Sequence, residues 1–174
     1  VVVLDRYGSV PAWERAVRDA GLKLMVMDDL DAASRADVIV RPLGGPAGTG
    51  GAIVLRGPAF LPLSPDLARL ASAPPHKPGA RLRLNVCFGG SDPTGETAKA
   101  LEAAAGLTDL DIDVVIGPGA RLDPALIEDA ARLPHVTLHR APSQAEMASL
   151  LASADLALGA GGVMLWERMC LGVP

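Results

Sequence analysis

Two glycine-rich segments are the parts of this sequence best suited to bind a ligand. Each follows an apolar run typical of a buried strand and precedes a helical pattern; they are Phe88–Thr94 (FGGSDPT) and Gly159–Val163 (GAGGV). Glycine lets a ligand approach the backbone, and the free amides at a helix N-terminus carry partial positive charge that suits phosphate. Together the segments favour a phosphate-bearing ligand. Tight strand-to-helix turns without a ligand are the alternative.

Glu167 follows the second glycine-rich segment on the same predicted helix. It stands four positions after Val163, so its carboxylate returns to the same helix face one turn further along. From there it can accept hydrogen bonds from a vicinal diol such as that of ribose. The alternative is a surface glutamate paired with a nearby arginine.

Several better-known catalytic motifs are absent from the sequence. It contains no GxGxxG fingerprint with an acidic residue about 20 positions later, no Walker lysine and no GxSxG segment. Cys87 and Cys170 lie in apolar surroundings without CxxC spacing, which argues against a disulfide framework or a zinc site. Phosphate binding without a metal or a cofactor is therefore the expectation.

Strand-like runs alternate with helical patterns, and this order predicts an α/β protein with mostly parallel sheets. The predicted strands are Val1–Leu4, Leu22–Met27, Asp37–Val40, Leu82–Phe88, Ile112–Ile116, Val136–Leu138 and Leu156–Leu158. The predicted helices include Pro11–Ala20 and Thr94–Ala105, with further starts at Asp123-Pro124 and at the capping-box sequence Ser143–Glu146. In the second half this succession gives a Rossmann-like half sheet.

The pattern breaks down between Arg41 and Pro78, where glycine and proline are frequent. We therefore predict a domain boundary near residue 79, with residues 1–78 as part of an N-terminal domain plus linker and residues 79–174 as a C-terminal nucleotide-binding domain. The chain opens on a strand without a start methionine and closes on a proline where another strand would begin. Both domains are accordingly expected to be incomplete.

Composition and charge exclude several classes of protein. Hydrophobic residues make up 49% of the chain and charged residues 21%, with a formal net charge of −4 and scattered basic residues, so a nucleic-acid partner is not expected. No apolar run reaches the length of about 18 residues that a membrane-spanning helix needs. Cysteine usage fits a reducing cytoplasm. Oligomeric state is left open.

The order of the motifs along the chain resembles a known family. The segments that carry the resemblance are Asp5–Gly8, Trp13-Glu14, Asp28-Asp29, Arg56–Pro58, Phe88–Pro93, Ala154–Gly162 and Trp166–Arg168. They resemble the UDP-sugar hydrolases of pseudaminic acid biosynthesis, the related spore-coat polysaccharide proteins and, more distantly, the MurG-type glycosyltransferases of GT-B fold.

This resemblance implies two Rossmann-like domains of GT-B type that face a cleft, with a UDP-sugar held mainly by the C-terminal one. Gly89, Gly90 and Ser91 would contact the diphosphate, together with Gly161, Gly162 and Val163. Glu167 would hold the ribose hydroxyls. The loop His139–Ala141 would run past the uracil, with backbone groups reading its edge, His139 and Arg140 in it and Met147 nearby; a structural or solvated His139 is the alternative.

The catalytic half of such a site is poorly represented in the sequence. The family's GxGH segment, whose histidine is expected to act in catalysis, is absent, and neither His76 nor His135 lies in that context. Tyr7 matches the tyrosine expected after the first strand, where its phenol could orient a water or a sugar hydroxyl. Packing of the Tyr7 ring is the alternative.

The function implied by the resemblance is hydrolysis of a UDP-activated acetamido sugar, in particular a diacetamido-trideoxy sugar, in nonulosonic acid or surface polysaccharide biosynthesis. Three alternatives stay open: UDP-sugar-dependent glycosyl transfer by a GT-B enzyme, nucleotide-sugar binding without turnover, and an α/β scaffold without a ligand. The sugar itself cannot be deduced from these residues.

Overall fold

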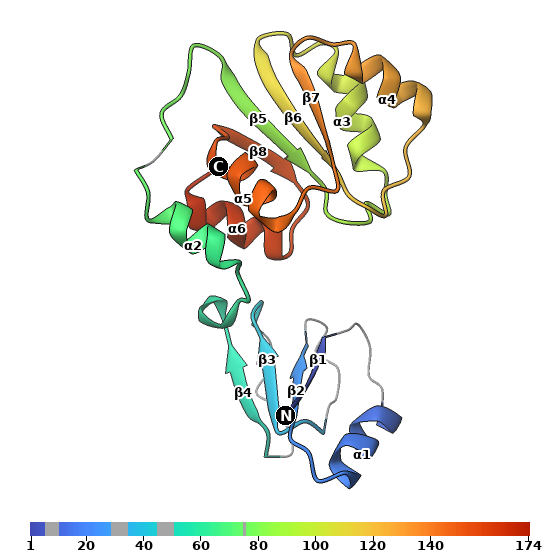
Figure 1. The fold of residues 1–174 in the computed structure, drawn as a ribbon, viewed down its shortest axis with the longest axis vertical. Helices are drawn as coiled ribbons and strands as arrows, with labels where there is room; N and C mark the ends of the chain where they lie inside the picture. The colour runs from blue at the N-terminus through green and yellow to red at the C-terminus, as the bar shows by residue number, and fades with distance from the viewer. Residues whose placement is uncertain (6–10, 29–34, 45–50, 75) are drawn as a thin grey trace. The chain divides into compact units, whose positions relative to one another are not determined.

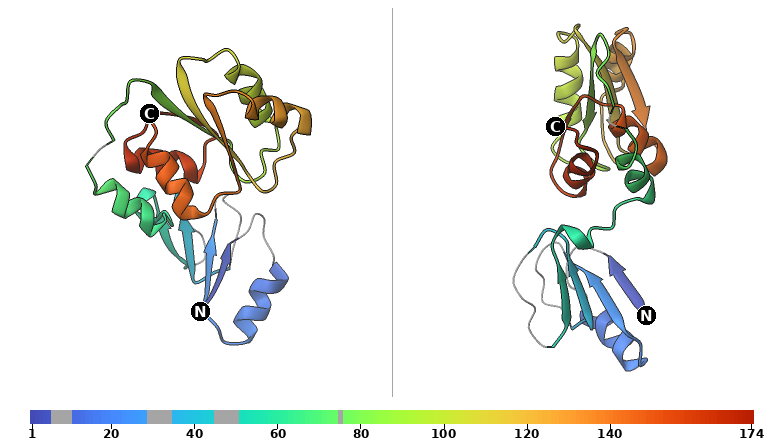
Figure 2. Two further views of the ribbon diagram at one scale, coloured as in Figure 1. Left: turned by 45° about the horizontal axis from the view of Figure 1, so that its top comes forward. Right: turned by 90° about the vertical axis from the view of Figure 1, so that its left-hand side faces the viewer.

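The computed structural model describes residues 1–5, 11–28, 35–44, 51–74 and 76–174, and its chain forms two compact units, Val1–Pro62 and Leu63–Pro174 (Figure 1). Each unit is built around a parallel sheet of four strands. Figure 2 shows the strands of each sheet side by side from two further directions. The fold is therefore the predicted α/β architecture, with two Rossmann-like units.

The first unit contains a sheet in the order β1-β2-β3-β4, which is the order of the strands along the chain. Its elements are β1 Val2–Asp5, α1 Pro11–Asp19, β2 Leu24–Met27, β3 Val38–Arg41, β4 Ile53–Arg56 and the 3₁₀ helix η1 Pro58–Phe60. The buried core consists of Leu24, Val26, Ala36 and Ile39. Alternate residues of β2 supply two of these side chains, as expected for one face of a strand.

A buried ion pair lies at the carboxyl ends of β2 and β3. The guanidinium of Arg41 donates to the carboxylate of Asp28 through Nη2 at 2.8 Å and through Nε at 3.1 Å. Both side chains are about 95% buried. A buried charge is tolerated when it is paired and hydrogen-bonded in this way, so the pair fixes the two strand ends relative to each other.

The second unit contains a sheet in the order β7-β6-β5-β8, with all three neighbouring pairs parallel. Its elements are α2 Pro65–Ala71, β5 Leu82–Cys87, α3 Glu96–Ala104, β6 Leu110–Ile116, α4 Pro124–Ala131, β7 Val136–Arg140, α5 Gln144–Ala152, β8 Leu156–Gly159 and α6 Val163–Leu171. The strand order reverses at β5, because β6 lies on one side of it and β8 on the other. In an open α/β sheet, such a reversal is where ligands bind, outside the carboxyl ends of the strands.

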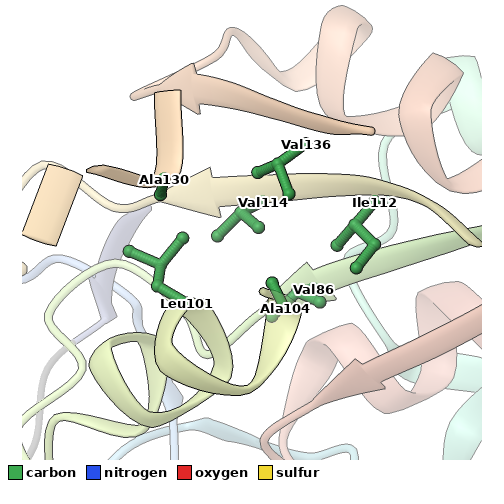
Figure 3. Packing of buried hydrophobic residues seen from close by; sticks show 7 residues of the cluster. All are labelled: Val86, Leu101, Ala104, Ile112, Val114, Ala130 and Val136. Carbon is green, nitrogen blue, oxygen red and sulfur yellow. The ribbon is translucent and has the colours of Figure 1, made fainter. Parts of the chain in front are cut away.

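The main core of the second unit lies between the sheet and the helices α3 and α4 (Figure 3). Leu101 and Ala104 of α3 point toward Val86 and Val114 of the two central strands (Figure 3). These four side chains are at most 2% exposed. The helices α2, α5 and α6 form a separate group whose members pack on one another (Figure 1).

The helix α2 is the one element of the described second unit that was predicted neither as a strand nor as a helix. Its start carries recognisable signals, because the Ser64 hydroxyl accepts a hydrogen bond from the Asp66 amide and Pro65 occupies the first turn. It packs against α5 and α6. The compact units therefore divide between Pro62 and Leu63, whereas the proline-rich segment 73–78 had suggested a boundary near residue 79.

The predicted helix starts of α4 and α5 are confirmed. The carboxylate of Asp123 accepts from the amide of Ala125 at 2.9 Å. Ser143 and Glu146 form a full capping box, in which each side chain accepts from the backbone amide of the other residue. These caps fix where the helices begin, and so also fix the length of the loops that precede them at the carboxyl edge of the sheet.

Candidate functional site

The two glycine-rich segments follow neighbouring strands of one sheet, β5 and β8. In the β5–β8 pair, Cys87 lies opposite Gly159, so both segments begin at the same level of the sheet edge. A Cβ atom on Gly159 would overlap the carbonyl oxygen of Cys87. Glycine at this position is therefore a packing requirement of the strand ends, separate from any ligand.

A third loop, which follows β6, packs against the segment after β5. A Cβ atom on Gly117 would overlap the carbonyl oxygens of Gly89 and Gly90, and the amide of Gly119 donates to the Gly90 carbonyl at 2.7 Å. This loop was not predicted to belong to the site. The signal was present, because a Gly-Pro-Gly sequence directly after a buried strand also lies at the carboxyl edge.

The helix start after β5 has Gly95 as its N-cap residue, and the first amides of α3 are bound by the side chain of Asp92, three residues earlier. The two carboxylate oxygens of Asp92 accept from the amides of Glu96 and Thr97 at 2.9 and 2.8 Å. Burial of Asp92 acts to raise the pKa of its carboxyl, but hydrogen bonds from Thr97, Glu96 and Gly95 outweigh it and hold the pKa below the usual value. Asp92 adopts a φ of +40°, which is uncommon for residues other than glycine, although aspartate and asparagine adopt it more often than most. The first turn of α3 thus already holds an anionic group.

The helix start after β8 has no such cap. Gly162 is the N-cap residue of α6, with a φ of +85° and no side-chain hydrogen bond. The amide of Leu165 donates to the Gly162 carbonyl, but the amides of Val163 and Met164 have no acceptor in the described part of the chain. Open space surrounds the positions where Cβ atoms of Gly161 and Gly162 would stand. This end of α6 is therefore free to bind an anion.

Glu167 lies one turn along α6 from this open end. The carboxylate is half-buried and has no hydrogen-bond or ion-pair partner among the described residues. Burial raises the pKa of Glu167 above its usual value. A partly desolvated carboxylate without a partner can accept hydrogen bonds from ligand hydroxyls. The ribose role of Glu167 stays a prediction that this placement permits.

The predicted uracil loop differs from what the structure shows, because His139 and Arg140 are the last two residues of β7 and only Ala141 lies outside the strand. The reason is that β7 continues alongside β6 as far as the Ile116–Arg140 pair, and the Ala141 amide then donates to the Ile116 carbonyl at 2.8 Å. Ala141 has a φ of +42°, so the chain turns sharply immediately after the strand.

His139 is held by an acidic residue of the neighbouring strand. Its Nε2 lies 2.7 Å from Oδ1 of Asp113 in β6. His139 and Arg140 line a pocket of about 720 Å³ whose other lining residues are Ala141, Pro142, Ala145, Glu146, Ser149, Leu150 and Ser153. Met147 does not line this pocket, although it lies in the same helix, α5. The structure thus places His139 and Arg140 at one pocket, and Met147 is not among the residues that line it.

The other two histidines make structural contacts. His135 Nε2 lies 2.9 Å from the carbonyl oxygen of Ala104, and His76 Nε2 lies 3.3 Å from Oδ1 of Asp155. Tyr7, the predicted catalytic residue, falls in the segment 6–10, outside the described residues. Its catalytic role stays a prediction.

Arg168, the last residue of the Trp166–Arg168 segment, is a residue of the site for which no role was predicted. Its Nη2 donates to the Ala160 carbonyl at 3.1 Å and its Nη1 to the Ala157 carbonyl at 3.4 Å, so it holds the backbone on both sides of Gly159. Only 9% of Arg168 is exposed. The available signal was an arginine placed among apolar residues of α6, directly after Glu167.

Neither a metal site nor a membrane-spanning helix is found among the described residues. These residues contain no cluster of three or more histidine, cysteine, aspartate or glutamate side chains that could hold a metal ion. Among the same residues, every helix is too short or too polar to cross a bilayer.

Two known proteins are similar to this chain in sequence. No family model matches it. It is 30% identical over 124 residues to the spore coat polysaccharide biosynthesis protein SpsG of Bacillus subtilis, a match covering 70% of this chain and 36% of SpsG. It is 24% identical over 190 residues to an uncharacterised protein of Methanocaldococcus jannaschii, covering all of this chain and 39% of that protein. The chain thus spans less than half the length of these relatives.

The fold has a solved counterpart in MurG of Acinetobacter baumannii. The two superpose with a TM-score of 0.50 at 16% sequence identity, over 99% of this chain and 50% of MurG. At that identity the likeness shows the fold alone, and the fold is that of the GT-B enzymes to which the sequence motifs pointed.

These comparisons correct the predicted activity. The resemblance implied a nucleotide-sugar hydrolase of pseudaminic acid biosynthesis, but the similar proteins are a polysaccharide biosynthesis protein and MurG, which point to glycosyltransferase-like enzymes. The hydrolase prediction is therefore wrong. It failed because every candidate site residue except Tyr7 lies in the C-terminal part of the chain, and a nucleotide site by itself does not distinguish hydrolysis from glycosyl transfer. What remains is a chain of GT-B-like fold related to a protein of polysaccharide biosynthesis.

Proposed function

We propose that this chain carries the nucleotide-binding part of a nucleotide-sugar-dependent glycosyltransferase that acts in polysaccharide biosynthesis. The donor is a UDP-sugar, and the acceptor is a sugar hydroxyl. The observation that carries the proposal is the uncapped start of α6, with free amides at Val163 and Met164 beside the strand-order reversal at β5. The likeness to MurG and to SpsG supports the same class of reaction.

The start of α6 would serve both binding and catalysis. Free amides and the helix dipole favour a diphosphate, and they favour it more as negative charge builds up on the leaving UDP during transfer. The ribose would lie one helical turn further, at Glu167. The base would lie toward the end of β7, where the pocket beside His139 and Arg140 opens.

Calorimetric titration of the protein with UDP tests the nucleotide site. We expect saturable binding, weakened about tenfold by Glu167→Ala, because one hydrogen-bonded charged group is worth about 1.4 kcal/mol or more. Glu128→Ala, which removes an exposed glutamate of α4, is the matched control and should leave the affinity unchanged. Failure of the unaltered protein to bind UDP would contradict the proposal.

The reaction class needs a separate measurement. UDP release from a UDP-sugar is followed with and without added sugar acceptors. Release that depends on the acceptor is the expected result. Tight UDP binding with no release in the presence of any acceptor would instead favour a nucleotide-sugar binding protein without turnover.

A further inference from the structure

Arg168 is a buried charge without a carboxylate partner. It is 91% buried, and the described residues include no acidic side chain in an ion pair with it. Its Nε is fully buried and makes no hydrogen bond. The comparison with Arg41 is instructive, because that equally buried guanidinium donates two hydrogen bonds to Asp28. An unpaired buried charge is costly, so the second unit holds a positive charge that lacks its counterpart.

The position of this charge points to what would balance it. The guanidinium binds the carbonyl oxygens of Ala157 and Ala160, and its Nη1 lies 3.6 Å from the place of a Cβ on Gly159. Through these carbonyl oxygens the guanidinium contacts the backbone segment that leads into the open start of α6. Burial raises the pKa of the Cys87 thiol at the end of β5, and among the smaller effects the charge of Glu167 also raises this pKa while the charge of Arg168 lowers it. The guanidinium therefore acts electrostatically at the ends of both strands.

We infer that Arg168 is a positioning residue for an anionic ligand group at the start of α6, and that its buried charge is balanced by the diphosphate of a nucleoside diphosphate. Through Ala160 it fixes the peptide unit just before Gly161, and so sets the course of the segment that ends in the free amides. The positive charge of Arg168 adds to the partial positive charge of these amides, and its side chain does not contact the ligand. This inference rests on the proposed nucleotide site.

A purely structural clamp makes a different prediction. If Arg168 acts only by holding two carbonyl groups, its loss disturbs the site for every ligand to the same degree. If its charge also matters, the loss selectively weakens ligands that carry a diphosphate. UDP and the neutral nucleoside uridine share the base and the ribose, so the ratio of their affinities isolates the charge.

The experiment compares Arg168→Gln and Arg168→Lys in the protein, with UDP binding followed by calorimetry and uridine binding by NMR titration. We expect Arg168→Gln to weaken UDP about tenfold more than uridine, because removing a nearby charge in a partly desolvated site changes affinity on that scale. Arg168→Lys, which keeps the charge and loses the planar fork, should restore most of the UDP-to-uridine ratio. Arg132→Gln, at an exposed arginine after α4, is the matched control and should change neither ligand.

The outcomes separate the inference from the proposal beneath it. If the unaltered protein binds no UDP, the proposed function fails and the inference fails with it. If UDP binds but Arg168→Gln weakens UDP and uridine equally, only the inference is overturned and Arg168 is a structural clamp. Should Arg168→Gln not fold, as judged by circular dichroism, Arg168→Lys decides: an unchanged UDP-to-uridine ratio supports the inference, and a tenfold drop or loss of folding overturns it.

Discussion

The helix starts that follow β5 and β8 lie side by side at one sheet edge, but they differ in whether a side chain of the protein accepts hydrogen bonds from their first amides. At α3 the carboxylate of Asp92 accepts from two amides, whereas at α6 two amides are left without an acceptor. Both follow a glycine-rich segment, so the sequence pattern alone makes them look equivalent. The difference shows that glycine marks where the backbone turns, while the presence or absence of a capping side chain decides whether an anion can bind there.

The largest expected effect comes from the glycines of the β8 segment, which differ in their surroundings. Gly159→Ala places a Cβ against the Cys87 carbonyl and should destabilise the protein by about 3 kcal/mol, because the strand ends must separate to admit it. Gly161→Ala enters open space and should cost less than about 1 kcal/mol. Urea denaturation curves of the two variants measure the difference. Equal losses would show that close packing at Gly159 does not distinguish it from Gly161.

A smaller effect is expected at Asp92. Asp92→Ala removes the cap of α3 and should destabilise the protein by about 1–2 kcal/mol, whereas Asp92→Asn keeps an acceptor and tolerates the positive φ, and should lose less. Thermal unfolding followed by circular dichroism gives both values. If the alanine variant were as stable as the parent, Asp92 would not be the group that occupies the α3 end.

The smallest effect is a difference in the sign of pH dependence. The pKa of Asp92 is lowered in the folded state, so its stabilising contribution is present above the unfolded pKa of about 3.9 and is lost as the pH falls through the folded value. The pKa of Glu167 is raised by burial, so its contribution is fully present below the unfolded pKa of about 4.3 and is lost as the pH rises through the folded value.

Denaturation across pH 3 to pH 8 tests this sign difference. Glu167→Gln should gain stability over the parent as the pH rises, because it removes a carboxylate that is costly to ionise. Asp92→Asn should instead lose stability relative to the parent as the pH rises, because only the parent gains the contribution of the ionised carboxylate. Parallel pH profiles of the two variants would contradict the assigned pKa directions.

The sequence predicted the fold well for a physical reason. Buried parallel strands are continuous apolar runs, and the described strands fall on the predicted ones to within a few residues at each end. The short run Ile53–Leu55 is also a strand, β4, although it was not assigned because glycine and proline surround it. The helix α2 was not predicted for the same reason, because glycine and proline are frequent in the segment around Ser64-Pro65.

The site was predictable only in part. Spacing placed Gly161, Gly162 and Glu167 on one helix start, because helix geometry is local. The occupation of the α3 start by Asp92 depends on a φ that no residue pattern specifies, and the end of β7 at Arg140 depends on how far its partner strand continues. The role of Arg168 depends on its burial and on the lack of a nearby carboxylate, which only tertiary packing decides.

The contact between the loops after β5 and β6 affects how tightly a ligand binds there. Because the Gly119 amide donates to the Gly90 carbonyl and Gly117 packs against both glycines, the tip of the β5 segment is held in one conformation before any ligand arrives. A ligand that meets a preorganised backbone loses little free energy to loop ordering. The Gly119 amide should accordingly exchange its hydrogen with solvent slowly even in the ligand-free protein, as a surface loop amide seldom does.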